Sequence, residues 1–210
     1  MRVLATELDP QRTYRLMTGI VVPRPIAWVC TRSPEGTVNI APFSAFTFVS
    51  TKPPMVGINV GRKAGVRKDT GRNIHAAREY TVHICDEPLL DAMHESSVEH
   101  PPEVSEVELL GLRTTASDIV SVPRLVDAPI AMECRLVQAI AFGDTGSEFM
   151  VGEVLAFHLR DGLLHDGKID SVALNPICRL AGPNYATLGP VTTKRPIQQT
   201  DKSLLADGSR

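Results

Sequence analysis

The sequence lacks an excess of charge of either sign and lacks any long hydrophobic run. Lys and Arg total 22 against 24 Asp and Glu, a formal net charge of -2. A nucleic-acid-binding protein usually carries a basic excess or a basic stripe, so we expect no nucleic-acid partner. No apolar run approaches the roughly 18 residues of a membrane span. The apolar stretch at the N-terminus covers only residues 3–5, too short for a signal peptide. We therefore expect a cytoplasmic protein with no membrane partner.

Cysteines are few and widely spaced. Cys30, Cys85, Cys134 and Cys178 form no CxxC pair and no cluster with histidine at zinc spacing. We expect reduced thiols packed as small hydrophobic groups. One acidic-histidine cluster lies at residues 94–100, but its members would not share one helical face and Pro101-Pro102 follows at once. A solvated loop is favoured there over a metal site, and we expect no metal.

Several sequence motifs of common enzymes are also missing. No GxGxxG follows a strand, and GxxxxGK[ST], GxSxG and HExxH do not occur. These absences disfavour a Rossmann dehydrogenase, a P-loop NTPase, an α/β-hydrolase and a zincin.

What is present is the composition of a globular domain. Hydrophobic residues make up 43% and charged residues 22% of the 210 residues, enough apolar material for a sizeable core. We find no internal repeat, low-complexity tract or interior linker. We therefore predict one domain over residues 1–210, with its core at about 10–195 and a polar tail after Val191.

Most segments have the pattern of strands joined by short turns. We predict strands at 26–31, 37–41, 55–60, 80–85, 130–142 and 149–159, with hairpin turns at 33–36 and 143–146. Helices are predicted at 10–19, 69–78 and 87–96, the first capped by Asp9 and left at Gly19, the second capped by Asp69. This order predicts a mostly β, antiparallel barrel with helical insertions rather than a doubly wound parallel sheet.

The segment 66–74 (VRKDTGRNI) has the features of an anion site. Two cations, Arg67 and Lys68, precede a predicted helix start, and Thr70 and Asn73 add a hydroxyl and an amide. A helix N-terminus offers unpaired N–H groups and a partial positive charge to an anion. An ordinary basic surface helix would show the same residues, and the spacing does not separate the two interpretations.

Two further segments are candidates for contact with a planar ligand. Arg24 lies between Pro23 and Pro25, which stiffen its backbone for holding a planar or anionic group. Hydroxyl residues interleave with phenylalanines over residues 39–54, a pattern that can line a flat heteroaromatic ring. A surface arginine at a strand entry and an amphipathic strand are the alternatives.

Taken together, these segments resemble a known family. The runs PRPIAWVCT, EGTVNIAPFSAFTFVSTKPPMVGINV and RKDTGRNI, followed by EVELLGL, VGEV and RLAGPNY, resemble the FMN-binding, flavin reductase-like split-barrel proteins. The resemblance covers residues 10–195. It implies an antiparallel split β-barrel with helical insertions, assembled as a homodimer with FMN near the subunit interface.

The resemblance also implies which residues bind the cofactor. Ser44, Ala45, Phe46, Thr47 and Ser50 would follow the isoalloxazine and ribityl edge, with Ala45 and Phe46 contributing main chain. The phosphate end would be surrounded by Lys68, Asp69, Thr70 and Asn73. Arg24 would lie close to the flavin, and Asn59, near the end of a strand, is a further candidate.

The implied activity is that of an NAD(P)H:flavin reductase, with hydride passing from the nicotinamide of NADH or NADPH to flavin N5. Reduced FMN can then be passed to a separate monooxygenase. No catalytic residue is assigned. In the best known two-component flavin reductases of this group, a Gly-Asp-His segment precedes the VGEV-like strand and its histidine helps hold the nicotinamide, whereas this chain has Gly143-Asp144-Thr145. A non-enzymatic FMN-binding or electron-carrier flavoprotein therefore stays open, as does a dimeric interaction module with a phosphate pocket.

Overall fold

Seven antiparallel strands form the main sheet of the computed structural model, which describes residues 1–197. In spatial order they are β3 (Val38–Phe43), β2 (Ala27–Arg32), β8 (Glu79–Ile84), β11 (Ile130–Phe142), β12 (Ser147–Leu159), β5 (Pro54–Val60) and β4 (Phe46–Thr51). The rest are two-residue strands: β1 (Arg24–Pro25), β6 (Arg62–Lys63), β7 (Val66–Arg67), β9 (Thr114–Thr115), β10 (Arg124–Leu125), β13 (Leu164–His165), β14 (Lys168–Ile169), β15 (Cys178–Arg179) and β16 (Tyr185–Ala186).

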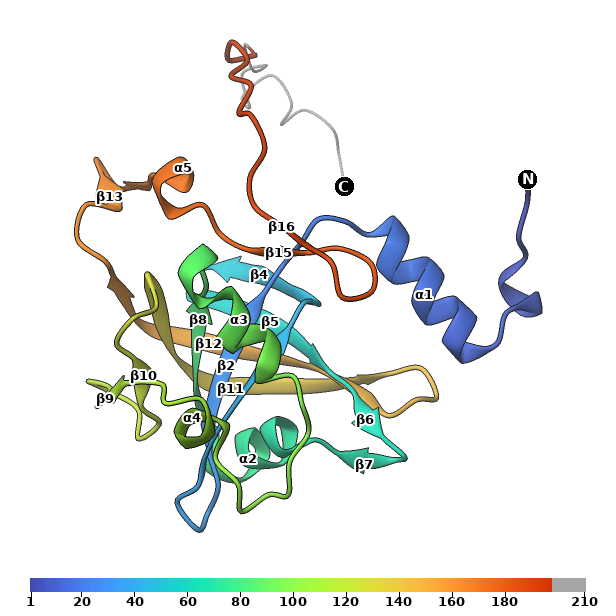
Figure 1. The fold of residues 1–210 in the computed structure, drawn as a ribbon, viewed down its shortest axis with the longest axis horizontal. Helices are drawn as coiled ribbons and strands as arrows, with labels where there is room; N and C mark the ends of the chain where they lie inside the picture. Colours follow the sequence, from blue (N-terminus) through green and yellow to red (C-terminus); the bar gives the residue numbers. More distant parts are fainter. Residues whose placement is uncertain (198–210) are drawn as a thin grey trace, which may run out of the picture.

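This sheet has to curl, because its two edge strands are neighbours in the sequence. β3 ends at Phe43 and β4 begins at Phe46, so three Cα steps of about 3.8 Å must connect the two edges. In a flat sheet, six gaps of about 4.8 Å would hold the edges almost 30 Å apart. The sheet therefore wraps into an open barrel with a seam at residues 44–45, as the ribbon shows (Figure 1).

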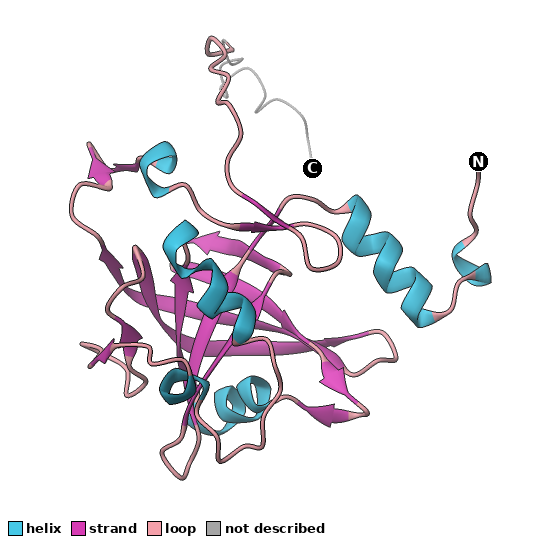
Figure 2. Ribbon diagram, in the orientation of Figure 1, coloured by secondary structure: helices cyan, strands magenta, loops and turns pink. Residues whose placement is uncertain are grey.

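The sheet is covered on both faces, as the alternation along β2 shows. Ala27 and Val29 belong to a core cluster inside the curled sheet. Trp28 and Cys30, together with Ile26 just before the strand, belong to a second cluster. The second cluster contains Met93 and Val107, from the helices α3 (Leu90–Glu95) and α4 (Glu106–Leu109), which cross the outside of the sheet (Figure 2).

The predicted N-terminal helix is confirmed as α1 (Pro10–Ile20), with η1 (Ala5–Glu7) before it. The Asp9 side chain accepts the N–H of Arg12 at 2.8 Å, and Pro10 occupies the first turn. The helix continues through Gly19, so the predicted exit is one residue early. No residue of α1 is buried, and the helix projects from the body of the molecule (Figure 1).

Two other helix predictions need correction. In helix α2 (Asp69–Ala77), Lys68 and not Asp69 occupies the N-cap position, and its side chain makes no cap hydrogen bond. Asp69 lies in the first turn, where its carboxylate pairs with Arg72 at 2.8 Å. The helix predicted at 87–96 divides into η2 (Glu87–Leu89) and α3, and the short α5 (Ser171–Leu174) was not predicted. The long hairpin is confirmed, although β12 begins two residues earlier than predicted.

The cysteines are free thiols, as predicted. Cys30, Cys85 and Cys134 are buried and Cys178 is half-buried. Burial raises the pKa of Cys30 to about 12, so this thiol is not a reactive group near neutral pH. Of the polar tail predicted after Val191, residues 191–197 have no regular secondary structure and residues 198–210 lie outside the described part.

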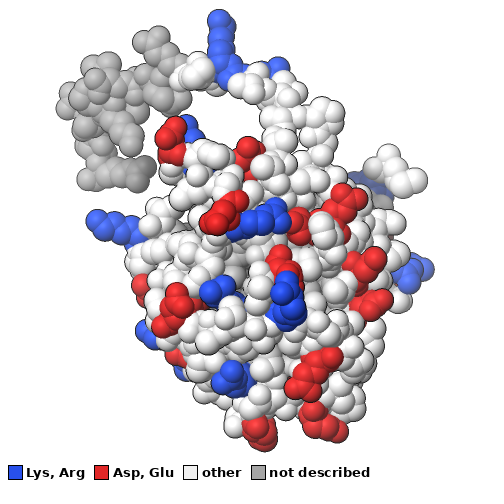
Figure 3. Space-filling model, turned by 60° about the vertical axis from the view of Figure 1, so that its left-hand side comes forward, with Lys and Arg blue, Asp and Glu red and all other residues white. Residues whose placement is uncertain are grey.

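Charge is mixed over the surface. On the face in Figure 3, acidic and basic side chains lie interspersed, with no broad area of one sign. Within residues 1–197, no helix is long and apolar enough to cross a membrane.

Candidate functional site

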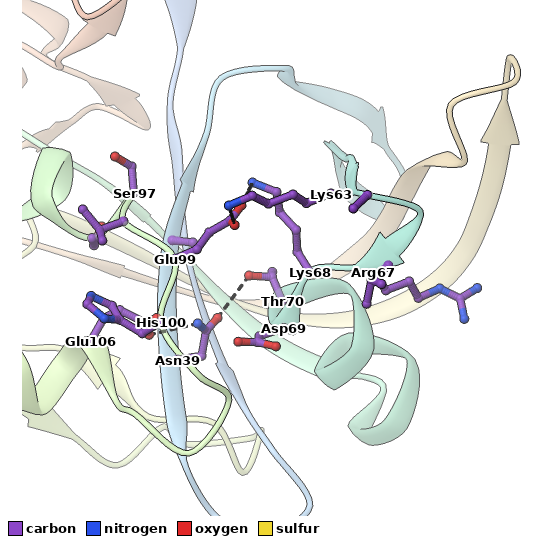
Figure 4. Close-up of a pocket in the computed structure, with 15 residues that line it drawn as sticks. Asn39, Lys63, Arg67, Lys68, Asp69, Thr70, Ser97, Glu99, His100 and Glu106 are labelled. Atoms are coloured by element: carbon purple, nitrogen blue, oxygen red, sulfur yellow. Dashed lines mark hydrogen bonds and ion pairs between the residues drawn. The ribbon is translucent and has the colours of Figure 1, made fainter.

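A cavity of about 330 Å³ lies where α2 begins. Its walls are formed by β3 (Asn39 and Ala41), the β6–β7 hairpin, the first turn of α2 and the segment 96–100 (Figure 4). Lys68, Asp69 and Thr70, which the sequence predicts as one site, all line it. In the β6–β7 hairpin Arg62 pairs with Arg67 and Lys63 pairs with Val66. This sharp turn leads the chain back to Lys68 at the start of α2.

The floor of the cavity is a network of buried polar side chains. The Glu106 carboxylate accepts the Asn39 amide at 2.9 Å and the N–H of Ile40 at 3.2 Å. Because a carboxylate only accepts, the Asn39 amide nitrogen must face Glu106 and its oxygen must face Thr70. Thr70 donates its hydroxyl proton to that oxygen at 3.1 Å. Burial raises the pKa of Glu106, partly offset by these hydrogen bonds.

Asn73 lies beneath this floor rather than in the cavity. It is buried, and its amide donates to the Thr31 hydroxyl at 3.1 Å, while Thr31 contacts Asn39 at 3.3 Å. The Asn73 oxygen is buried without a hydrogen-bond partner in the described part of the chain. Asn73 therefore supports the residues of the floor.

The mouth of the cavity carries the cations. Lys63 and Lys68 both reach the carboxylate of Glu99, with Lys68 at 3.2 Å (Figure 4). The hydrogen bond from Lys63 lowers the pKa of Glu99, and Lys68 adds to the effect. Arg67 turns away and binds Glu148 through two nitrogens at 2.9 and 3.1 Å.

A second cavity, of about 340 Å³, adjoins the first at Ser97, which lines both. Arg24, Ile26, Pro42 and Ser44 form one side of it, so it follows β3 toward the seam of the barrel. The two cavities thus share Ser97 and lie beside successive parts of the chain, the first at Asn39 and Ala41 and the second at Pro42 and Ser44.

Arg24 donates most of its hydrogen bonds to main-chain carbonyls around this second cavity. Its guanidinium donates to the carbonyls of Thr18 and Val21 at 2.5 and 2.7 Å, and to that of Leu180 at 2.9 Å. It also donates to the Ser44 hydroxyl at 3.2 Å. Arg24 thus joins the end of α1, the seam and the C-terminal segment.

The remaining predicted residues lie elsewhere. Phe46, Thr47 and Ser50 line a third, largely apolar cavity of about 540 Å³, together with Pro25, Phe48, Met55, Met132 and Phe157. Asn59 is exposed on β5 and lines none of the three cavities, and the carbonyl of Ala45 accepts its N–H at 2.9 Å. The structure therefore groups Lys68, Asp69 and Thr70 near Ser44 and Arg24, and it separates them from Phe46, Thr47 and Ser50.

Among the residues of the first cavity that sequence reasoning missed are those of its floor and mouth: Asn39, Lys63, Glu99 and Glu106. Asn39 could have been found as a polar residue in an apolar strand. Ser105 caps α4 by accepting the N–H of Glu108, a local signal that places Glu106 at a helix start. Glu99 and Lys63 have no comparable local signal.

A separate acidic-histidine group lies outside these cavities. Asp118, Glu133 and His158 place ligand atoms within 4.8 Å of one another. Glu133 is fully buried and accepts the N–H groups of residues 118–120 at 2.7–2.9 Å, together with His158 at 2.7 Å. Its oxygens are fully used in holding this loop to β11, and we assign the group a structural role.

Comparison with solved structures identifies proteins of the same fold. Nitrilotriacetate monooxygenase component B from Bacillus cereus superposes with a TM-score of 0.90 and 39% identity, covering 92% of this chain and 98% of that one. The 2-nitrobenzoate 2-nitroreductase NbaA of Pseudomonas fluorescens gives 0.85 and 32%, over 96% and 99%. A flavin reductase-type protein with a split barrel domain from Shewanella frigidimarina, at 19% identity and a TM-score of 0.81 over 94% and 100%, shares the fold.

The sequence itself matches one family over most of its length. The match to the flavin reductase like domain spans residues 17–173, which include both adjoining cavities except the helix residue Tyr14 and the C-terminal contacts Arg179 and Gly182. The expected split-barrel fold is thereby confirmed. The chain belongs to the flavin reductase-like family of split-barrel flavoproteins.

Proposed function

We propose that the two adjoining cavities bind FMN and that the protein is an NAD(P)H:flavin reductase. The observation that carries this is the order of groups along β3: lysines at the mouth, a hydroxyl and amide floor, and then the seam at Ser44. FMN has the same order of phosphate, ribityl hydroxyls and ring. Each cavity is within the volume range of small-molecule sites.

The hydrogen-bond directions favour one orientation of the ligand. Lys63 and Lys68 would hold the phosphate, assisted by the N–H groups at the start of α2. Thr70 donates its proton to Asn39, so its oxygen meets a ligand as an acceptor. An acceptor suits a ribityl hydroxyl better than a phosphate oxygen. The ring would then lie toward Ser44 and Arg24.

Bound FMN would supply the redox chemistry by accepting a hydride at N5 from NADH or NADPH. The chain would fix the flavin in place and support its polar edge through main-chain groups at the seam, residues 44–46. Arg24 would position Ser44. No residue of the two cavities is needed to transfer a proton, so we assign no catalytic acid or base.

A homodimer and a monooxygenase partner complete the proposal. The third cavity lies on an apolar face where Phe48 is 74% and Phe157 is 54% exposed, and a second copy of the chain would cover it. Similarity to a monooxygenase component B supports the transfer of reduced FMN to a separate monooxygenase. Sedimentation showing only a 22.8 kDa species at micromolar concentration with FMN bound would refute the dimer.

An FMN-binding electron carrier is the alternative, and one observation favours it. Thr145, at the position where the best known two-component flavin reductases have histidine, shares a hydrogen bond with the Ser147 hydroxyl at 3.1 Å and lines neither adjoining cavity. Absorbance of the purified protein with FMN, recorded with NADH and with NADPH, separates the two. Bleaching of the visible absorbance of oxidised flavin supports the reductase. Tight FMN retention without NAD(P)H oxidation supports the carrier.

The binding site is tested by Lys68→Ala, titrated with FMN and with riboflavin. A charge-assisted hydrogen bond contributes about 1.5–3 kcal/mol, and the Lys68 side chain is 40% exposed, so we expect FMN to bind about tenfold more weakly. Riboflavin, which has no phosphate, should be unaffected. Lys168→Ala, an exposed lysine in β14, is the matched control. Equal losses for both flavins would place the phosphate elsewhere.

A further inference from the structure

Glu99 reaches into the mouth of the FMN cavity and pairs with both of its lysines. The residue comes from the segment 96–100, which forms one wall of the cavity. Its two carboxylate oxygens are divided between the cations, one meeting Lys63 and the other meeting Lys68 at 3.2 Å. Figure 4 shows the three side chains converging above Thr70.

The other charged groups around the cavity already have partners of their own. Three cations and three carboxylates line it: Lys63, Arg67, Lys68, Asp69, Glu99 and Glu106. Arg67 pairs with Glu148 and Asp69 pairs with Arg72. The Glu106 carboxylate lies at the floor, where it accepts hydrogen bonds from the Asn39 amide and the Ile40 N–H and makes no ion pair with a described residue. Lys63 and Lys68 are therefore the cations left for an anionic ligand, and both already hold a carboxylate.

We infer that Glu99 is an internal competitor for the phosphate of FMN and so sets how tightly and for how long the flavin is held. The inference rests on the proposed FMN site. A phosphate that reaches Lys63 and Lys68 must replace the Glu99 carboxylate or share the two cations with it. Glu99 is thus a specificity-determining residue, acting on flavins that carry a phosphate and not on riboflavin.

The physical balance favours an exchangeable ligand. The side chains of Glu99 and Lys68 are 39% and 40% exposed and that of Lys63 is 71% exposed, so water weakens both ion pairs. A phosphate monoester carries a charge of about -1.5 to -2 at pH 7 and can displace a single carboxylate. When the flavin leaves, the Glu99 carboxylate pairs again with the two lysines. Such an arrangement suits a reductase that passes its reduced flavin to another protein.

The test is Glu99→Gln, which keeps the shape of the side chain and removes its charge. We expect FMN to bind about two- to thirtyfold more tightly, the combined effect of two exposed ion pairs. Riboflavin should bind as it does to the parent. FMN dissociation, followed by stopped-flow displacement with excess riboflavin, should slow by a similar factor. The gain should shrink at high salt, because the lysines are solvent-exposed.

Glu103→Gln is the matched control. It makes the same change of charge four residues further along the segment, at an exposed carboxylate that makes no ion pair with any described residue. If Glu99→Gln binds FMN with the parent constant, or if Glu103→Gln tightens FMN equally, the inference is overturned and the proposed site stands. Weaker FMN binding by Glu99→Gln would overturn it too, because Glu99 would then be holding the lysines ready for phosphate. If neither parent nor variant binds FMN, the proposed function fails and takes the inference with it.

Discussion

Arg24→Ala should release the N-terminal helix and the C-terminal segment from the barrel. The guanidinium donates three hydrogen bonds to carbonyls, of Thr18, Val21 and Leu180, and a fourth to Ser44. Because α1 has no buried residue, these bonds are a main link between its C-terminal end and the rest of the molecule. The substitution therefore removes a tether that apolar packing of α1 does not replace.

The magnitude follows from the exposure of those bonds. Three of the four are partly buried, and the bond to Val21 is exposed. A hydrogen bond to a charged group contributes about 1.5–3 kcal/mol at full burial, and carbonyls that can turn to water recover part of the loss. At about 1 kcal/mol for each partly buried bond, we expect the free energy of unfolding to fall by about 3 kcal/mol.

Urea denaturation measures the loss in the free energy of unfolding. Limited proteolysis between α1 and β1 measures the release of α1 from the barrel. Arg15→Ala on the same helix is the control, since that guanidinium is exposed and makes no ion pair with a described residue. Arg24→Lys separates this structural role from a direct electrostatic contact with flavin, because it keeps the charge and loses the fork. If Arg24→Ala has the same free energy of unfolding and the same rate of proteolysis as Arg15→Ala, the reasoning is refuted.

Two further predictions concern buried polar groups. Burial lowers the pKa of His83 to about 4 from 6.5, and the pKa of Glu133 is lowered to about 2 from 4.5 because hydrogen bonds from the backbone N–H groups of residues 118–120 and from His158 outweigh its burial. The unfolded chain takes up each proton first, so the free energy of unfolding should fall between about pH 6.5 and 4 and again between about 4.5 and 2. Each loss should reach about 3 kcal/mol, and urea titrations of His83→Gln and Glu133→Gln should flatten the upper and lower windows respectively; an unchanged pH slope would contradict the assignment. The Tyr80 hydroxyl is buried with no hydrogen-bond partner among the described residues. Tyr80→Phe should therefore leave the free energy of unfolding unchanged or raise it by up to about 1 kcal/mol, and the thermal midpoint should stay the same or rise. Gly152→Ala should lower the thermal midpoint sharply, because the added Cβ would lie 2.0 Å from the Tyr80 hydroxyl oxygen. A lower midpoint for Tyr80→Phe would show that the hydroxyl has a partner.

Local sequence patterns determined the parts of this protein that depend on neighbouring residues. Asp9 and Pro10 mark the start of α1, because a cap and a first-turn proline act within three residues. The turn at residues 143–146 predicts the β11–β12 hairpin for the same reason. Both signals act over a few adjacent residues, so they can be recognised without knowledge of the tertiary structure.

Side-chain pairing across space was decided only by the tertiary structure. Phe46, Thr47 and Ser50 follow Ser44 closely in the sequence, yet β4 begins on the other side of the seam and carries them to the apolar cavity. No local pattern reports the seam, because it results from strand order over the whole sheet.

The cavity itself shows this limit most clearly. The motif at residues 66–74 supplied Lys68 and Thr70, because the residues of a helix start are adjacent in the chain. The floor and the competing carboxylate come from far along the sequence: Asn39 meets Glu106 across 67 residues, and Lys63 meets Glu99 across 36. Contacts of that separation depend on how the barrel curls and where the segment 96–105 crosses it. Their residues therefore became recognisable as a site only in the folded molecule.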